Sequence, residues 1–177
     1  MNPSEQESQP SAGDAAAATI PSPEEALRLA IQLHQHGQME EAERIYRMIL
    51  SVFPDQPETL HFLGVLLHQR GESEQGIACI RQAIERQGVY PAALNNLGNI
   101  LTQLRRFEAA ATAYRRAIAQ DPNLADPHLN LGNLLLNQGR HEDAAAAYAR
   151  ALELNPRHRD SYEKLGAALI EMKRYDE

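Results

Sequence analysis

The chain repeats itself with a period of 34 positions, and this period constrains the fold more than any other feature. The dipeptide Leu-Gly returns four times at that spacing, at Leu63-Gly64, Leu97-Gly98, Leu131-Gly132 and Leu165-Gly166. A second column with the same period holds Tyr46, Ile80, Tyr114 and Tyr148. A fixed period of roughly 20–50 residues indicates units that each form one supersecondary element and bury their apolar faces against their neighbours.

Each unit has the pattern of two short amphipathic helices. In the third unit, leucines recur at spacings of three and four, which is the helical period, at Leu94, Leu97, Leu101 and Leu104. This pattern breaks at Arg105-Arg106, and a second helical pattern ends at Asp121-Pro122. Sustained alternation of apolar and polar residues is absent, and Ala, Leu, Glu, Gln and Arg favour helix. The sequence therefore predicts an all-α fold of paired helices.

Local signals predict where helices begin and turn. Ser22-Pro23-Glu24-Glu25 combines an N-cap Ser, a Pro in the first helical position and a Glu that closes a capping box. Asp126-Pro127 predicts that the first helix of the fourth unit begins a residue or two late. Glycines at positions 37, 71 and 139 lie between paired helices, where a chain reversal favours positive φ. Arg105 and Lys173 replace Gly at the equivalent places, so we expect those turns to be strained or differently shaped.

The repeated pattern resembles that of the tetratricopeptide-repeat family. It is carried by Leu94, Leu97-Gly98, Leu101, Ala110, Tyr114 and Pro122, and again by His128, Leu131-Gly132, Leu135, Ala144, Tyr148 and Pro156. The resemblance covers residues 23–177 and implies a right-handed α-solenoid of antiparallel helix pairs. The second unit departs most, with Gly76, Ile80 and Gly88 in place of Ala, an aromatic residue and Pro, so we expect its second helix to pack less tightly.

The period also predicts the domain organisation. Residues 1–22, rich in Ser, Pro, Gln and Glu, are predicted to be a disordered leader. The array over 23–177 divides into four full units, 23–56, 57–90, 91–124 and 125–158, and a partial fifth unit, 159–177. In that fifth unit we expect a first helix from residue 160 to about 172 and only the start of a second. Because natural arrays end in a polar capping helix, we interpret the chain as a fragment of a longer protein whose array continues; the alternative is a genuine end with a frayed or partner-covered last helix.

Composition excludes several classes of function. The net charge is −7, with 24 acidic and 17 basic residues, which argues against nucleic-acid and anionic-membrane partners. No apolar run approaches the ~18 residues of a membrane span, and the N-terminus lacks the basic start of a signal peptide. The single Cys79 excludes an internal disulfide framework and is expected to be a small buried hydrophobe. These features predict a cytoplasmic protein.

The resemblance further implies that the first helix of each unit lines a concave groove. Asn96 and Asn130, like Asn99 and Asn133, are one period apart and are expected to stack on adjacent helices. An Asn amide offers both a donor and an acceptor, so such a column can hold a peptide backbone. The column resembles the Asn ladder in O-linked N-acetylglucosamine transferases; the alternative is that these Asn only solvate the groove or bond a neighbouring loop. The predicted groove residues are Asn95, Asn96, Asn99, Gln103, Asn130, Asn133, Asn137, His61, His68 and Lys164.

Other site chemistries fit the sequence poorly. A carboxylate clamp needs several cations on successive first helices, whereas Lys164 is the sole candidate and Asp160 opposes it, so a neutral or cationic segment suits the groove better. His34, His61 and His68 should lie near one another, but their spacing and the lack of further ligands favour ordinary groove histidines over a metal site. The sequence has none of the common catalytic motifs, which predicts no enzyme activity and no cofactor.

Three hypotheses for function follow. The first is a non-catalytic scaffold whose groove binds an extended peptide or a partner's helix. The second is the substrate-recruiting N-terminal region of a larger bacterial-type glycosyl-, methyl- or sulfotransferase whose catalytic domain lies beyond residue 177. The third is self-association through the incomplete last unit, around Leu165 and Leu169.

Overall fold

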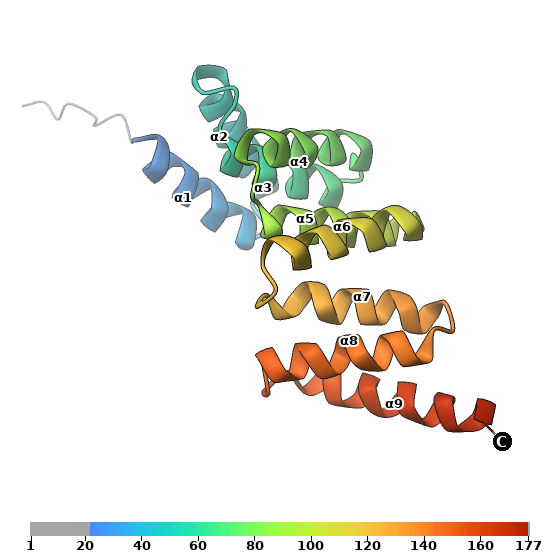
Figure 1. Ribbon diagram of the computed structural model, residues 1–177. Coiled ribbons are helices and arrows are strands. Elements are labelled where there is room, and N and C mark those ends of the chain that lie inside the picture. The colour runs from blue at the N-terminus through green and yellow to red at the C-terminus, as the bar shows by residue number, and fades with distance from the viewer. Residues whose placement is uncertain (1–21, 177) are drawn as a thin grey trace, which may run out of the picture.

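The computed structural model describes residues 22–176, with side chains described as far as residue 173; the predicted leader, apart from Ser22, lies outside this range. Within it the chain forms nine α-helices and no strand (Figure 1). The helices are α1 (Pro23–Gln35), α2 (Met39–Val52), α3 (Pro57–Gln69), α4 (Ser73–Gln87), α5 (Pro91–Gln103), α6 (Phe107–Gln120), α7 (Ala125–Asn137), α8 (His141–Leu154) and α9 (Arg159–Asp176).

The first helices of the four full units begin one period apart, at Pro23, Pro57, Pro91 and Ala125. Proline suits the first helical position because its missing N–H has no partner there in any case. At α1 the predicted capping box is present: Ser22 Oγ accepts from the Glu25 N–H at 3.2 Å, and Glu25 accepts from the Ser22 N–H at 2.9 Å. The predicted late start of α7 is wrong. Pro127 lies within its first turn, where N–H groups have no intrahelical acceptor, so the helix keeps the common register.

The turns between paired helices follow the glycine prediction. Gly37, Gly71 and Gly139 have φ values of 79°, 88° and 72°. Arg105 occupies the equivalent turn with a φ of 59°, and it is the one non-glycine residue with positive φ in the described part of the chain. The predicted strain at Arg105 is therefore present, because a Cβ crowds the following carbonyl in this left-handed conformation.

The last helix differs from its prediction. Lys173 lies inside α9, which continues to Asp176 instead of turning after about residue 172. In the full units the second helix packs back on the first and makes the turn favourable. Among the described residues no helix packs on the far side of α9, and its backbone hydrogen bonds are then best satisfied by continuing the helix.

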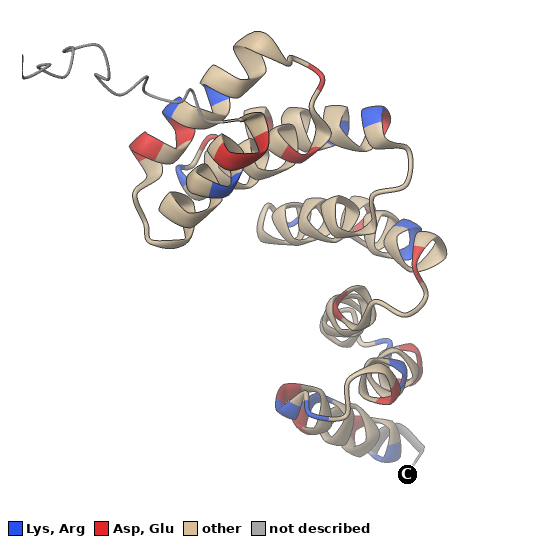
Figure 2. Cartoon of the chain, turned by 90° about the vertical axis from the view of Figure 1, so that its left-hand side faces the viewer, with Lys and Arg blue, Asp and Glu red and all other residues tan. Residues whose placement is uncertain are grey.

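The helix pairs stack into a right-handed α-solenoid. Each helix contacts the next one along the chain, and the first helices α1, α3, α5, α7 and α9 also contact one another in order. Within residues 22–176 the second helices α2, α4, α6 and α8 do not contact one another. The array therefore curves with the first helices on its concave side and the second helices splayed apart on its convex side (Figures 1 and 2).

Within a unit, the two helices interlock through a glycine and a tyrosine. A Cβ added to Gly98 would lie 2.6 Å from Cδ1 of Tyr114, and one added to Gly132 would lie 2.9 Å from Cδ1 of Tyr148. Both tyrosines are almost fully buried. The ring of the second helix thus occupies the space that a side chain on the first helix would need, which explains why these two columns repeat together.

The second unit is packed closely, so the expectation of looser packing is wrong. Ile80 is fully buried, and a Cβ on Gly64 would lie 2.6 Å from both Ile80 Cγ1 and the carbonyl oxygen of Gly76. The smaller Ile80 is offset by Gly76, which has no side chain and lets the backbones of α3 and α4 approach directly.

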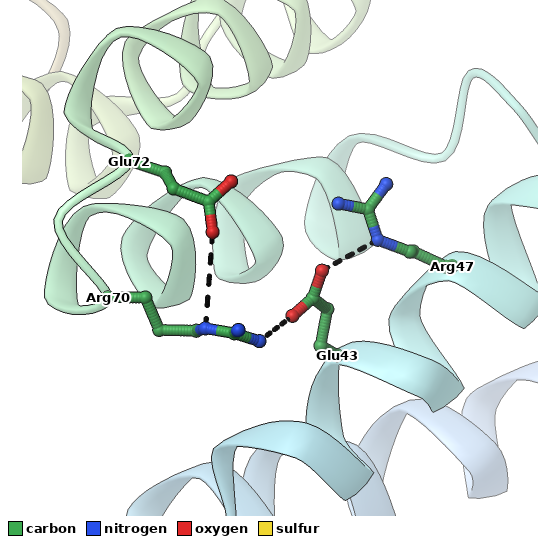
Figure 3. A network of polar contacts seen from close by, with 4 residues as sticks. All are labelled: Glu43, Arg47, Arg70 and Glu72. Carbon is green, nitrogen blue, oxygen red and sulfur yellow. Dashed lines mark hydrogen bonds and ion pairs between the residues drawn. The ribbon is translucent and has the colours of Figure 1, made fainter.

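A charged network joins the first two units. Glu43 on α2 accepts from Arg47 Nε at 2.7 Å and also pairs with Arg70, the C-cap residue that follows α3 (Figure 3). Arg70 Nε lies 4.0 Å from Glu72 in the following turn. The Glu43 side chain is only 15% exposed, so this contact between units is less screened by solvent than an ordinary surface ion pair.

Candidate peptide-binding groove

The centre of the concave surface is polar but nearly uncharged. Helix α5 contains no charged residue, and α7 contains one, Asp126 in its first turn. The charges of the array are concentrated on other helices and on the turns (Figure 2). A ligand over α5 and α7 would therefore meet amides and apolar groups.

Polar pairs link the first helices across units, and every pair joins residues 35 positions apart. His34 Nε2 lies 2.8 Å from Gln69 Oε1, and His68 Nε2 lies 2.9 Å from Gln103 Oε1. Asn96 Nδ2 donates to His61 Nε2 at 2.8 Å, and Asn130 Nδ2 donates to Asn95 Oδ1 at 3.0 Å. Residues one period apart are therefore not hydrogen-bonded to each other: Asn96 pairs with His61, and Asn130 pairs with Asn95.

Two predicted groove residues are buried instead of open. Asn95 is 8% exposed and His61 is 4% exposed, and each faces the next unit. Because His61 Nε2 accepts from Asn96, its Nδ1 carries the proton and donates to the Tyr90 hydroxyl at 2.9 Å. Burial lowers the pKa of His61 to about 4. The two side chains therefore hold neighbouring units together, and no sequence signal indicated this because burial depends on the adjacent helix.

Asn99 and Asn133 have partners within their own units. The Tyr114 hydroxyl donates to Asn99 Oδ1, and the Tyr148 hydroxyl donates to Asn133 Oδ1, both at 2.9 Å. Burial raises the pKa of Tyr148 to about 12, so this phenol stays protonated and available as a donor. The repeated Asn–Tyr spacing of 15 positions was visible in the sequence and could have identified these pairs.

These contacts determine which atom of each amide remains available for a further hydrogen bond. Asn96 and Asn130 use Nδ2, so Oδ1 has no protein partner among the described residues. Asn99 and Asn133 use Oδ1, so their Nδ2 atoms have no protein partner among the described residues. All four side chains are partly exposed. Among the described residues, Asn96 and Asn99 on α5 thus leave one acceptor and one donor about one helical turn apart, and Asn130 and Asn133 do the same on α7.

Three of the remaining predicted residues are solvent-exposed, and the fourth, His68, is partly exposed. Gln103 and Asn137 lie at the ends of α5 and α7, and Lys164 lies on α9.

A hollow of about 410 Å³ opens between α1 and α3 beside Asn96. Ile31, Phe62 and Val65 supply its apolar lining, and His34 and Gln69 supply polar atoms. His68 is held by Gln103 and by the Ser73 hydroxyl at 2.9 Å, so the three predicted histidines bond to separate partners.

Three further observations on the described residues concern metal binding, the single cysteine and a membrane span. Among residues 22–176 no three His, Cys, Asp or Glu side chains are grouped so that they could hold a metal ion. Burial raises the pKa of the Cys79 thiol. In the same part of the chain, no helix has the length and apolar character needed to cross a membrane.

Stacked helix pairs around a polar, nearly uncharged groove define a protein-interaction scaffold of the α-solenoid class. Four sequence profiles, described as TPR repeat or tetratricopeptide repeat, match residues 23–66, 57–89, 98–139 and 125–158. The chain belongs to the tetratricopeptide-repeat family. A search of curated protein sequences found no significant match.

Solved structures share the fold. The crystal structure of the MamA protein is 24% identical, with a TM-score of 0.74 over 87% of this chain and 84% of that chain. PilF from Pseudomonas aeruginosa is 21% identical, with a TM-score of 0.80 over 86% and 70%. YrrB, described as a TPR protein with an unusual peptide-binding site, is 18% identical, with a TM-score of 0.67 over 84% and 76%. At these identities the similarity shows the fold alone.

Proposed function

We propose that the concave groove binds an extended segment of a partner protein through the segment's main chain, as a non-catalytic scaffold. The carrying observation is the fixed orientation of four amides on α5 and α7. Asn96 and Asn130 each leave an acceptor, while Asn99 and Asn133 each leave a donor. In an extended peptide the N–H and C=O of one residue point to the same edge, where they can bond one acceptor and one donor.

Preorganisation supports this proposal. Each amide is already held by a partner in the protein, so binding a peptide would immobilise little additional side-chain freedom. Main-chain recognition is tolerant of ligand sequence, and the uncharged centre of the groove adds no demand for ligand charge. A peptide-binding site is described for YrrB, which shares the fold, and this supports the same class of ligand here.

The test converts the unpaired donors into acceptors. In Asn99→Asp with Asn133→Asp, each carboxylate can still accept from its tyrosine, but the outward N–H is replaced by oxygen. We expect binding to an array of short extended peptides to weaken by about 1–3 kcal/mol, the scale of a hydrogen bond with a partner left unsatisfied. Helicity and melting temperature should stay close to those of the wild type.

Two measurements separate main-chain recognition from other causes. Repeating the array at high salt controls for the added charge, because a purely electrostatic loss is screened there. The proposal would be contradicted if the wild-type protein bound no peptide, or if the variant bound peptides as well as the wild type does. If melting falls sharply instead, the outward amide atoms have a structural role.

Self-association through the last unit stays a separate prediction. Tyr162, Leu169 and Ile170 on α9 are 55%, 46% and 62% exposed, while Leu165 is partly buried against the core. Sedimentation over a range of protein concentrations tests it, with Leu169→Ser and Ile170→Ser as the disrupting variant. A monomer mass that does not change with concentration would contradict it. The cytoplasmic location likewise stays a prediction from the sequence.

A further inference from the structure

Arg105 occupies a backbone position that the other units reserve for glycine. The equivalent turns hold Gly37, Gly71 and Gly139, all with positive φ, and Arg105 has the same left-handed conformation despite its side chain. A Gly at this position would relieve the strain. Strained residues of this kind are often found at binding sites.

The Arg105 side chain lines a hollow of about 300 Å³ between the α5–α6 turn and the end of α7. Its guanidinium carbon lies 5.8 Å from the centre of the Phe107 ring, which orients the charged group. Leu134, 1% exposed, supplies apolar lining, and the amide side chains of Asn137 and Gln138 complete it. In the part of the chain that the structure describes, no carboxylate lines the hollow and no residue forms an ion pair with Arg105, whereas the neighbouring Arg106 pairs with Glu74.

The Asn137 amide has no hydrogen-bond partner within residues 22–176, for an identifiable reason. Gln69, Gln103 and Asn137 are equivalent residues at the ends of successive first helices. Gln69 and Gln103 each bond a histidine 35 positions earlier. The residue in that place for Asn137 is Thr102, whose hydroxyl already donates to the Gly98 carbonyl at 2.9 Å and lies 3.2 Å from the Tyr114 hydroxyl. Asn137 is thus left beside Arg105 with its donors unused.

We propose that this hollow, the Arg105 subsite, binds a carboxylate that lies next to an apolar group, as on an acidic residue of the segment held in the groove. The inference rests on the proposed function for the source of that carboxylate. The guanidinium supplies a planar fork of donors that matches a carboxylate, and the Asn137 and Gln138 amides add further donors. Leu134 and Phe107 accommodate the apolar part. The subsite lies about one helical turn beyond Asn133 on α7, so a segment crossing the groove can reach it.

A small probe tests the subsite independently of the groove. N-acetyl-leucine, which carries a free carboxylate, is titrated into ¹⁵N-labelled protein, and N-acetyl-leucinamide is the neutral control. We expect saturable shifts of the Arg105 Nε, Asn137 and Gln138 side-chain signals with the acid only, and no shift of the Asn137 and Gln138 signals in Arg105→Gly. Shifts that are absent, equal with the amide, or retained in Arg105→Gly overturn the proposal.

A second experiment links the subsite to the peptide ligand. Array peptides are compared in pairs that differ by Glu or Gln at one position. The wild type should prefer the Glu member of some pairs by about tenfold, the scale of one charge-assisted hydrogen bond. Arg105→Gly should lose this preference while binding the Gln members as before, and its melting temperature should equal or exceed that of the wild type. Arg116→Ala, which removes another exposed cation, should keep the preference.

The outcomes distinguish the two proposals. If no peptide binds but the acid probe shifts the Arg105 subsite, main-chain recognition fails and the subsite stands. If peptides bind and lose affinity in the Asn99→Asp with Asn133→Asp variant, but no pair shows a Glu preference that Arg105→Gly removes, the subsite fails alone.

Discussion

Asn130 donates from Nδ2 to Oδ1 of Asn95, 3.0 Å away, and the two residues are 35 positions apart in a chain whose period is 34. The extra position has a geometric cause. Residues one period apart occupy equivalent places and point in the same direction, so they cannot face each other. A contact between adjacent first helices needs one side chain on the side that faces the following unit and one on the side that faces the preceding unit. Successive residues point about 100° apart around a helix, so they supply these two sides, and the contacting residues are one period plus one position apart.

The Asn95–Asn130 contact predicts a structural role for Asn95. Asn95→Ala removes the acceptor of a partly buried hydrogen bond, so the free energy of unfolding should fall by about 1–2 kcal/mol. Urea unfolding of Asn95→Ala, Asn130→Ala and the double variant forms a cycle whose coupling energy should be about 0.5–1.5 kcal/mol. Asn137→Ala, which removes an exposed amide without a partner, is the matched control and should change stability little. Additive effects of the two changes would contradict the contact.

The glycine–tyrosine interlock predicts a sharp difference between two equivalent glycines. Gly98→Ala should destabilise the protein by about 1–3 kcal/mol, because the methyl group would overlap the Tyr114 ring. A Cβ on Gly166 in α9 would meet nothing within 4 Å. Gly166→Ala should therefore be neutral or stabilising by up to about 1 kcal/mol, since Ala favours helix over Gly. Thermal and urea unfolding measure both, and equal effects at the two positions would count against the interlock.

Buried His61 predicts a dependence of stability on pH. Its folded-state pKa of about 4 lies below the ordinary value of 6.5, so the unfolded chain binds this proton more readily. The contribution is present above pH 6.5 and is lost as the pH falls towards 4, with a slope of at most about 1.4 kcal/mol per pH unit. Urea unfolding between pH 7.5 and 4.5 measures the slope.

His61→Asn isolates this effect, because Asn95 is the equivalent residue in the next unit and pairs with an Asn amide there. The difference in unfolding free energy between the wild type and His61→Asn should shift in favour of the variant as the pH falls. His68→Thr, chosen because Thr102 is the equivalent residue in the next unit, controls for the loss of a histidine as such. A difference independent of pH would show that His61 is protonated without cost in the fold.

The Glu43 network predicts a salt-dependent contribution to stability. Glu43→Gln should lower the free energy of unfolding by about 1–2 kcal/mol at low ionic strength, because two arginines lose their charged acceptor in a mostly buried place. The loss should shrink at high salt. Glu74→Gln removes an exposed partner of Arg106 and should have little effect at either salt concentration. Unfolding curves for both variants at two salt concentrations give the comparison.

The sequence by itself determined the family, the helical class and most helix positions, because these depend on local spacing. The regular period and the Leu-Gly columns require stacked helix pairs, and the glycines at 37, 71 and 139 mark reversals that few other residues adopt. The local signals misled where a proline fits the first turn of a helix, where a neighbouring helix fills the space, and where no neighbouring helix is packed. Pro127 suggested a late helix start, Ile80 suggested loose packing, and Lys173 suggested a turn that no packed helix favours among the described residues.

Only the tertiary structure decided what the asparagines do. Asn95, Asn96, Asn99 and Asn130 look alike in the sequence, since each is an Asn on a first helix. Their partners differ: another Asn, a buried histidine, and a tyrosine from the second helix of the same unit. Which amide atom stays unpaired depends on those partners. Hydrogen bonding between side chains depends on distances of a few tenths of an ångström across helices, and residue spacing along one chain does not contain that information.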